Sequence, residues 1–248
     1  MINYVINLDR RSDRWDEFVE KLNKTSEFKK EIFIRISAFD GYNHEEEIKR
    51  YNLENFSIIK FLRQNKVIVK KGVLGCLMSH VIALYNILQN TDIKEDDYVG
   101  IYEEDIFYPE NFDNKYKKFK EINLNELGVE FLYLGGRVDP DFEASKNENM
   151  FEKTDNKNIY LRKDPCEGGY DWDRGAFAYI VKKSICAKLI KLLTTRFATS
   201  CLRLIAFDAL LVKFYKDIKM FDYFPHIIYS KFEYKTDVQT QSDDLIYF

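Results

Sequence analysis

YVINLDRRSDRWDEFVEKL (residues 4–22) joins a short apolar strand directly to an amphipathic helix. Tyr4–Leu8 is apolar and β-prone, and the charged run that follows it contains a candidate helix cap, Ser12. Apolar residues then recur at i, i+3, i+4 and i+7, the spacing of one helix face packed on a sheet: Trp15, Phe18, Val19 and Leu22. The stretch therefore predicts a strand–helix unit at the start of an α/β fold.

The same alternation of strands and helices continues along the chain. Further buried strands are expected at Ile32–Ile36, Tyr98–Tyr102, Phe131–Leu134 and Ala176–Val181. The longest helix opens at Gly72 and Gly75. The pattern predicts an α/β domain over residues 1–248, with a mostly parallel central sheet flanked by helices. Residues 135–170 are polar and lack periodicity, so we expect a lid or an acceptor-binding loop there.

The composition and net charge disfavour some classes of protein. The chain has 248 residues, 32% of them charged, and a formal net charge of -3, which does not favour nucleic-acid or membrane-surface binding. No segment is expected to reach the roughly 20 apolar residues of a membrane span, and the N-terminus does not resemble a signal peptide. We therefore expect a cytoplasmic protein or a trimmed soluble domain. The cysteines lack CxxC spacing and are expected to be free thiols: Cys76, Cys166, Cys186 and Cys201.

Three carboxylates follow the strand Tyr98–Tyr102 directly: Glu103, Glu104 and Asp105. In open α/β sheets the ligand site lies outside the carboxyl ends of the strands. Alternate residues of an extended segment share a face, so Glu103 and Asp105 are expected to hold one hard divalent cation while Glu104 points away. Such a cation would hold a diphosphate; the alternative is a solvated acidic turn.

A polar array lies at the end of the first strand: Asn7, Arg10, Arg11 and Arg14. Guanidinium and amide groups suit phosphate or nucleotide oxygens, although a solvated helix start explains the same residues. With Asp40 and Gly41, at the end of the neighbouring strand, this array is expected to form a nucleotide pocket. Some of the arginines must face solvent, because the apolar face of the helix points inward.

Eight motifs, in order along the chain, resemble those of family 25 glycosyltransferases: VINLDRRSDRW, AFDGY, GVLGCLMSH, YEEDI, YLGGR, GAFAYIVKKSICAKLI, FDALL and TDVQTQSDD. The resemblance runs from Asn3 to Asp244. That family includes bacterial lipooligosaccharide sugar transferases and collagen hydroxylysine galactosyltransferases. The resemblance implies a GT-A fold, inversion at the anomeric carbon, a divalent ion (Mn²⁺ or Mg²⁺) and a nucleotide-sugar donor, usually UDP-galactose or UDP-glucose.

The resemblance also suggests roles for individual residues. Gly75 and His80 belong to the GVLGCLMSH motif and are expected near the donor, although a core or capping histidine is the simpler interpretation of His80. His226 is a candidate metal ligand, because many GT-A enzymes supply a histidine near the C-terminus; a buried or surface histidine without a metal role is the alternative. Asp208 of FDALL matches the family's acid after the GAFAYIV segment and is the candidate catalytic base, with helix capping as its alternative.

Two sequence features concern the choice of metal and the identity of the acceptor. The family usually has Glu-Asp-Asp where this chain has Glu103-Glu104-Asp105, so metal choice changes if the middle acid is a ligand. YLGGR and the aromatic YDW are closer to the collagen-type branch, which favours an acceptor such as hydroxylysine of a collagen-like protein, with a glycan as the alternative. Asp171 or Asp173 would replace Asp208 if it proved structural.

Two other function classes fit part of the sequence. A metal-dependent phosphoesterase or nuclease also needs clustered carboxylates, but a nuclease should carry a basic track, which the sequence lacks. A catalytically silent nucleotide-sugar binding module is favoured only by Glu104.

Overall fold

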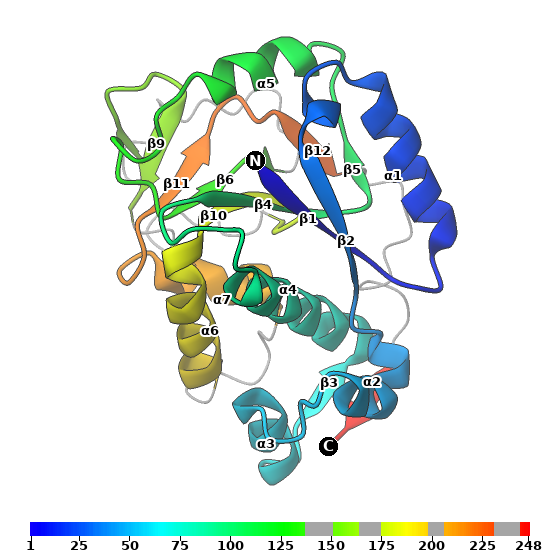
Figure 1. Cartoon of the computed structure of the whole chain (residues 1–248). Helices are drawn as coiled ribbons and strands as arrows, with labels where there is room; N and C mark the ends of the chain where they lie inside the picture. Colours follow the sequence, from blue (N-terminus) through cyan, green and yellow to red (C-terminus); the bar gives the residue numbers. More distant parts are fainter. Residues whose placement is uncertain (137–150, 164–174, 198–205, 231–243) are drawn as a thin grey trace.

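The computed structural model describes residues 1–136, 151–163, 175–197, 206–230 and 244–248. Its centre is an eight-stranded sheet (Figure 1). In spatial order the strands are β2 (Ile32–Ser37), β1 (Ile2–Asn7), β4 (Tyr98–Glu103), β10 (Ala178–Lys182), β6 (Phe131–Tyr133), β11 (Met220–Tyr223), β9 (Ile159–Arg162) and β8 (Phe151–Lys153).

Strand direction makes the sheet mixed. β1 pairs in parallel with β2 and β4, and β6 pairs in parallel with β11. β10 is antiparallel to both β4 and β6, and β9 is antiparallel to both β11 and β8. β10 and β9 thus run against the other strands, which share one direction. The α/β class and the flanking helices are confirmed, with these two antiparallel strands inserted.

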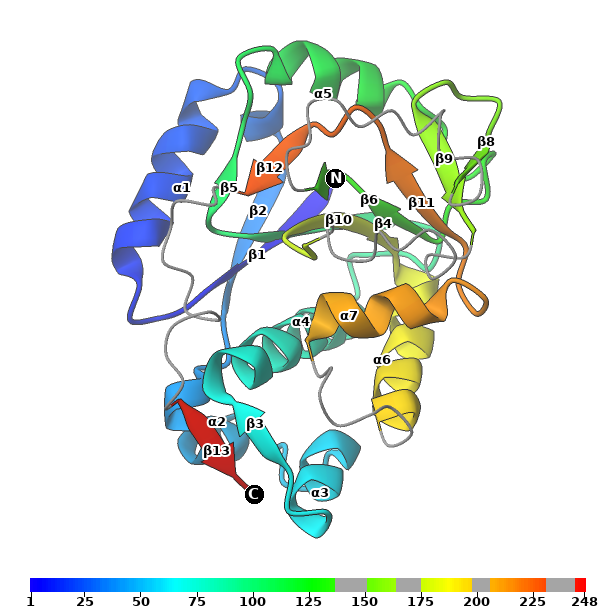
Figure 2. The same ribbon diagram turned by 180° about the vertical axis from the view of Figure 1, so that it is seen from behind.

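Helices cover both faces of the sheet because successive side chains of each strand point to opposite sides. Tyr4 and Ile6 of β1 pack with α4 (Lys71–Gln89), α6 (Lys183–Phe197) and α7 (Phe207–Leu211). Val5, between them, packs with α1 (Ser12–Lys24) and α5 (Phe112–Lys120) on the other face. Figures 1 and 2 show these two helical layers from opposite sides.

Smaller elements complete the fold. β12 (Ile228–Ser230) lies between β5 (Ile106–Phe107) and β7 (Gly135–Gly136) in a second sheet. β13 (Leu245–Tyr247) pairs with β3 (Ile68–Lys70), beside α2 (His44–Arg50) and α3 (Ser57–Gln64) (Figure 2). Three short 3₁₀ helices are also described: η1 (Phe28–Lys30), η2 (Gly41–Asn43) and η4 (Val212–Phe214). The chain's last described segment therefore returns to the start of α4, where the Lys71 amide donates to the Asp244 carbonyl at 2.9 Å.

Several local predictions need correction. Ser12 is the first residue of α1 and not its cap; Arg11 occupies the cap position without a side-chain cap bond. Residues 135–170 are not one plain loop, since β8 and β9 form an antiparallel pair at the sheet edge. The rest of the expected lid, 137–150 and 164–170, lies outside the described residues, as does Arg137 of YLGGR.

α4 also corrects an expectation. By length and composition Lys71–Gln89 could cross a membrane. In the fold most of this helix is buried. The helix packs against β1, α6 and α7, so its apolar character is accounted for by the core.

Candidate active site

A cavity of about 250 Å³ lies at the carboxyl ends of β1, β2 and β4. The first three turns of α4 and the start of α7 form other walls. Ten residues predicted from the sequence line it: Arg10, Arg14, Asp40, Gly41, Gly75, His80, Glu103, Glu104, Asp105 and Asp208. Segments more than a hundred residues apart in the sequence therefore meet at one site.

The three carboxylates all face this cavity, which corrects the expectation that Glu104 points away. β4 ends at Glu103, and the chain turns at Glu104 and Asp105 before β5. A turn does not keep the two-residue alternation of a strand. The Glu104 carboxylate instead pairs with Arg14, whose Nη1 lies 3.2 Å from Glu104 Oε1.

Burial and mutual repulsion raise the pKa of each carboxyl group in this turn. Burial, followed by the nearby Asp208 charge, raises the pKa of Glu103 to about 7. Burial and Asp105 raise the pKa of Glu104 to about 7. Burial and Glu103 raise the pKa of Asp105 to about 7, although Arg14 partly opposes this. Arg14 alone thus does not neutralise the cluster.

The cluster fits a divalent cation. Asp105 Oδ1 is buried and has no hydrogen-bond partner among the described residues. An orphaned carboxylate oxygen is costly unless an ion or a donor compensates it. Hard cations such as Mg²⁺ and Mn²⁺ take carboxylate oxygens as ligands. Glu103 and Asp105 therefore have the chemistry to hold such a cation.

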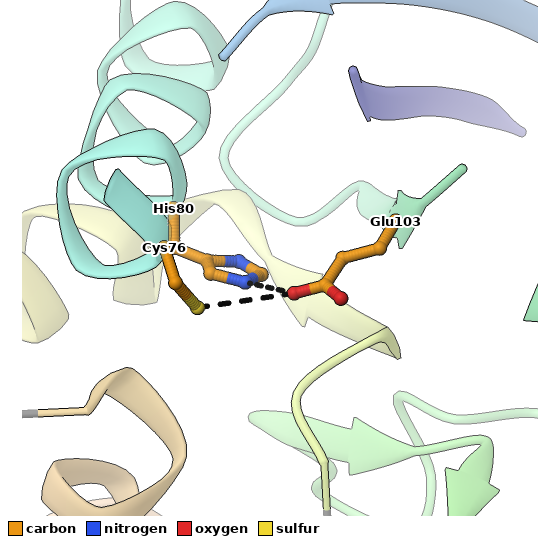
Figure 3. Close-up of side chains that lie close together, drawn as sticks. All are labelled: Cys76, His80 and Glu103. Atoms are coloured by element: carbon orange, nitrogen blue, oxygen red, sulfur yellow. Dashed lines mark hydrogen bonds and ion pairs between the residues drawn. The ribbon is translucent and has the colours of Figure 1, made fainter. Parts of the chain in front are cut away.

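Glu103 also contacts two residues of α4 (Figure 3). Its Oε1 lies 3.2 Å from His80 Nε2 and 3.9 Å from Cys76 Sγ. His80 is fully buried; burial lowers its pKa to about 3, so the ring is neutral at physiological pH. On the other side of the ring, Nδ1 lies 3.0 Å from the Tyr179 hydroxyl.

The loop after β2 forms the far wall of the cavity. Asp40 caps η2 by accepting a bond from the Tyr42 amide at 3.0 Å, and it pairs with Arg10 Nε at 3.0 Å. The Arg10 guanidinium and the Lys71 ammonium lie 5.3 and 5.1 Å from the centre of the Tyr42 ring. Cations and an aromatic ring are thus gathered at one end of the cavity.

The two predicted glycines allow this loop to approach α4. A Cβ at Gly41 would lie 1.9 Å from the Lys71 carbonyl oxygen. A Cβ at Gly75 would lie 3.0 Å from the Phe39 carbonyl oxygen. Close backbone packing thus explains both glycines, without requiring that either touch a ligand.

Asp208 lies in the first turn of the short helix α7, half-buried on the wall of the cavity. Its Oδ1 accepts a bond from the Ala209 amide at 2.8 Å. The aspartate therefore satisfies an amide of the first turn and also faces the site.

The remaining predicted residues do not line the cavity. Asn7 is buried, with Oδ1 accepting from Arg35 Nε at 2.8 Å and Nδ2 donating to the Arg11 carbonyl at 3.1 Å. Arg11 pairs with Asp13 at 2.7 Å. The His226 ring lies tilted against the Phe224 ring, with 4.6 Å between ring centroids, and among the described residues it is not part of the cluster that contains Glu103. Asp171 and Asp173 lie outside the described residues.

Sequence reasoning missed three side chains at the site: Tyr42, Cys76 and Tyr179. Tyr42 closes the quoted AFDGY motif, and Cys76 precedes His80 by one helical turn within GVLGCLMSH. That i, i+4 spacing places the cysteine beside His80 on one helix face, a contact that the free-thiol prediction does not include. Tyr179 lies in an apolar strand, and its sequence context gives no signal of its contact with His80.

One protein family has a profile that covers most of this chain. The profile of glycosyltransferase family 25 (LPS biosynthesis protein) matches residues 1–211. The procollagen lysyl hydroxylase and glycosyltransferase of Acanthamoeba polyphaga mimivirus is 29% identical over 137 residues, 53% of this chain. The match spans only 14% of that viral protein. A glycosyltransferase involved in glycosylation of the major capsid of PBCV-1 is similar in structure at a TM-score of 0.49 and 8% identity, over 95% of this chain and 94% of the other.

Proposed function

The chain belongs to glycosyltransferase family 25, and from that premise we propose that it is an inverting, metal-dependent hexosyltransferase. Its donor is UDP-galactose or UDP-glucose, and its acceptor is a hydroxyl group. The observation that carries this proposal is the convergence of Glu103, Asp105 and Asp208 on one cavity beside two arginines.

The donor's UDP would lie between the loop after β2 and the carboxylate turn. Arg10 and Tyr42 offer a cation and an aromatic ring at that end, where they suit a diphosphate and a base. Asp40 fixes Arg10 in place through their ion pair. The N-terminus of α4 lines the cavity through Gly72 and Val73, and the helix dipole favours an anion there.

Glu103 and Asp105 would hold Mn²⁺ or Mg²⁺. The ion, when bound, supplies positive charge that stabilises the departing diphosphate. Arg14 holds Glu104 in an ion pair, so Glu104 orients the turn and leaves the outer pair to bind the ion. The substitution of glutamate for the family's usual aspartate is then compatible with metal binding.

Asp208 would act as the general base. An inverting transfer needs a group that takes the proton of the acceptor hydroxyl as its oxygen attacks the anomeric carbon, while the C–O bond to UDP breaks on the opposite face. Asp208 lies on the cavity wall and close enough to Glu103 to raise its pKa. An ionised carboxylate there can accept that proton and return it to solvent.

The acceptor is proposed from the names of related proteins. The mimivirus relative is named as a procollagen lysyl hydroxylase and glycosyltransferase, which favours hydroxylysine of a collagen-like chain. The family's description as an LPS biosynthesis protein favours a glycan hydroxyl. Assays with a hydroxylysine-containing collagen peptide and with a lipooligosaccharide acceptor distinguish the two.

The proposal is tested by measuring UDP release from UDP-galactose and UDP-glucose with an acceptor present. We expect turnover with Mn²⁺, loss of turnover in EDTA, and recovery when Mn²⁺ is added back. The Asp105→Asn variant should stay folded and lose nearly all turnover, because it removes a cation ligand. Full activity in EDTA would overturn the metal assignment.

A further inference from the structure

We infer that Cys76, His80 and Glu103 form a site for a zinc-like transition metal that shares Glu103 with the hard-cation site and is chemically distinct from it. The three side chains come from two elements, α4 and the end of β4 (Figure 3). The inference rests on their geometry and does not depend on the proposed transferase activity.

Their ligand atoms have the spacing of a metal site. Cys76 Sγ, a His80 ring nitrogen and a Glu103 oxygen all lie within 4.8 Å of one another. The two contacts to Glu103 Oε1 are 3.2 Å from His80 and 3.9 Å from Cys76. A tetrahedral zinc ion with bonds of about 2.0–2.3 Å keeps its ligand atoms about 3.5 Å apart. Small side-chain movements are therefore enough to seat the ion.

The surrounding fold orients two of the ligands before any ion binds. Cys76 and His80 are one helical turn apart and project from the same side of α4. The Tyr179 hydroxyl lies 3.0 Å from Nδ1, and the Phe207 ring stacks on the imidazole at 4.2 Å. These contacts point Nε2 toward Glu103. When Nε2 binds a metal, Nδ1–H can donate to Tyr179, a common arrangement for histidine ligands.

The ligand types select the metal. Thiolate and imidazole suit Zn²⁺, Co²⁺ and Cu ions, whereas Mg²⁺ and Mn²⁺ prefer carboxylate oxygens such as those of Glu103 and Asp105. On binding, the Cys76 thiol loses its proton to solvent, and thiolate and carboxylate together balance the two positive charges of the ion. Water in the cavity would complete the tetrahedron. Because both sites use Glu103, zinc and the hard cation compete.

Cobalt provides a direct test, since Co²⁺ replaces zinc at tetrahedral sites and absorbs light there. Titrating the metal-free chain with Co²⁺ should give visible tetrahedral bands and a near-ultraviolet thiolate-to-cobalt band, both removed by one equivalent of Zn²⁺. Cys76→Ser should abolish the thiolate band. The thiolate band should persist in three control variants that each remove another cysteine: Cys186→Ala, Cys166→Ser and Cys201→Ser. It should also persist in Asp105→Asn, because Asp105 belongs to the hard-cation site. A thiolate band that survives Cys76→Ser, or no such band in the wild type, would overturn the inference.

A measurement on the unmutated protein covers the case in which Cys76→Ser does not fold. Alkylation of each cysteine by iodoacetamide is followed by peptide mass spectrometry. Zn²⁺ should slow alkylation of Cys76 by about tenfold at nine-tenths occupancy, whereas Mg²⁺ should not. Equal alkylation of Cys76 with and without Zn²⁺ would contradict the site. Loss of transferase activity alone leaves both outcomes unaffected, so failure of the proposed function is distinguishable from failure of this site.

Discussion

At the scale of single residues, Asp208 can serve a structural role, a catalytic role or both, and the substitution Asp208→Asn distinguishes them. As a side chain that bonds the Ala209 amide, it would contribute about 0.5–2 kcal/mol to stability. As a general base, its loss would slow the reaction by about 10²- to 10⁴-fold. Asparagine keeps an oxygen that can bond the amide but has no basicity.

We therefore expect Asp208→Asn to fold, to bind UDP with metal, and to transfer at least about a hundredfold more slowly. Steady-state kinetics with a UDP-binding control measure this. Transfer within a few-fold of the wild-type rate would assign Asp208 to structure.

At the scale of elements, the end of β4 should make stability depend on pH. The folded-state pKa values of Glu103, Glu104 and Asp105 are raised to about 7, above their ordinary values of 4.5, 4.5 and 3.8. The folded chain therefore binds more protons than the unfolded chain between about pH 4 and pH 7. Stability contributed by the protonated cluster is present below this window and is lost as pH rises through it.

The metal-free protein should thus have a lower Tm at pH 8 than at pH 5. For a group such as Glu104, a pKa moved from 4.5 to about 7 corresponds to roughly 3 kcal/mol. Saturating Mn²⁺ should reduce the difference, and Asp105→Asn should reduce it without metal. Circular dichroism melts in EDTA measure it; a Tm that rises from pH 5 to pH 8 would contradict the assignment of a repulsive cluster.

β9 and β11 are joined by a second buried charge pair, away from the cavity. Arg162 and Asp222 side chains are 1% and 0% exposed and make bonds of 3.0 and 2.7 Å. The Arg162 guanidinium also lies 4.1 Å from the centre of the Tyr133 ring. Removing one partner leaves the other charge buried and unpaired.

We expect Asp222→Ala to lower the free energy of unfolding by about 3–5 kcal/mol. The double variant Asp222→Leu with Arg162→Met should lose less, because neither charge remains. Urea denaturation of both variants checks this. A single variant as stable as the wild type would show that the pair contributes little.

The elements most visible in the sequence were those with strong periodicity. β2, β4, α1 and α4 match the predicted ranges closely because each is an apolar run or a clear helical face, whereas β1 begins two residues before the predicted Tyr4 and ends at Asn7. β3 and β13 have three residues each and pair with each other although they lie far apart in the sequence. No local pattern therefore identifies them. Site residues that directly follow a predicted strand, such as Glu103, could be identified from local sequence. The contact of Tyr179 with His80 could not, because it forms only when β10 packs against α4.

The turn after β4 shows the limit of local reasoning. Two-residue alternation predicts that Glu104 points away from Glu103, and it fails because the strand ends at Glu103, the first residue of the acidic run. Arg14 of α1, ninety positions away, then pairs with Glu104. Only the assembled fold could reveal that contact.

At the scale of the whole molecule, the site is built where β1, β2 and β4 end and α4 begins. The last described residues also reach it: Asp244 accepts a bond from the Tyr42 hydroxyl at 2.6 Å, and β13 pairs with β3 just before α4. The C-terminal segment 244–248 therefore supports the loop that we assign to the donor. Ligand binding there should be sensitive to the integrity of the entire fold.

The central claim is that Glu103 and Asp105 hold a cation which in turn holds the diphosphate of UDP. Isothermal titration of UDP into the protein, with and without Mn²⁺, tests it most directly. Coupling between two ligands at one site should tighten UDP binding by about 5- to 150-fold when Mn²⁺ is present. Asp105→Asn should lose that gain while keeping its fold by circular dichroism. Equal UDP affinity with and without Mn²⁺ in the wild-type protein would contradict the account.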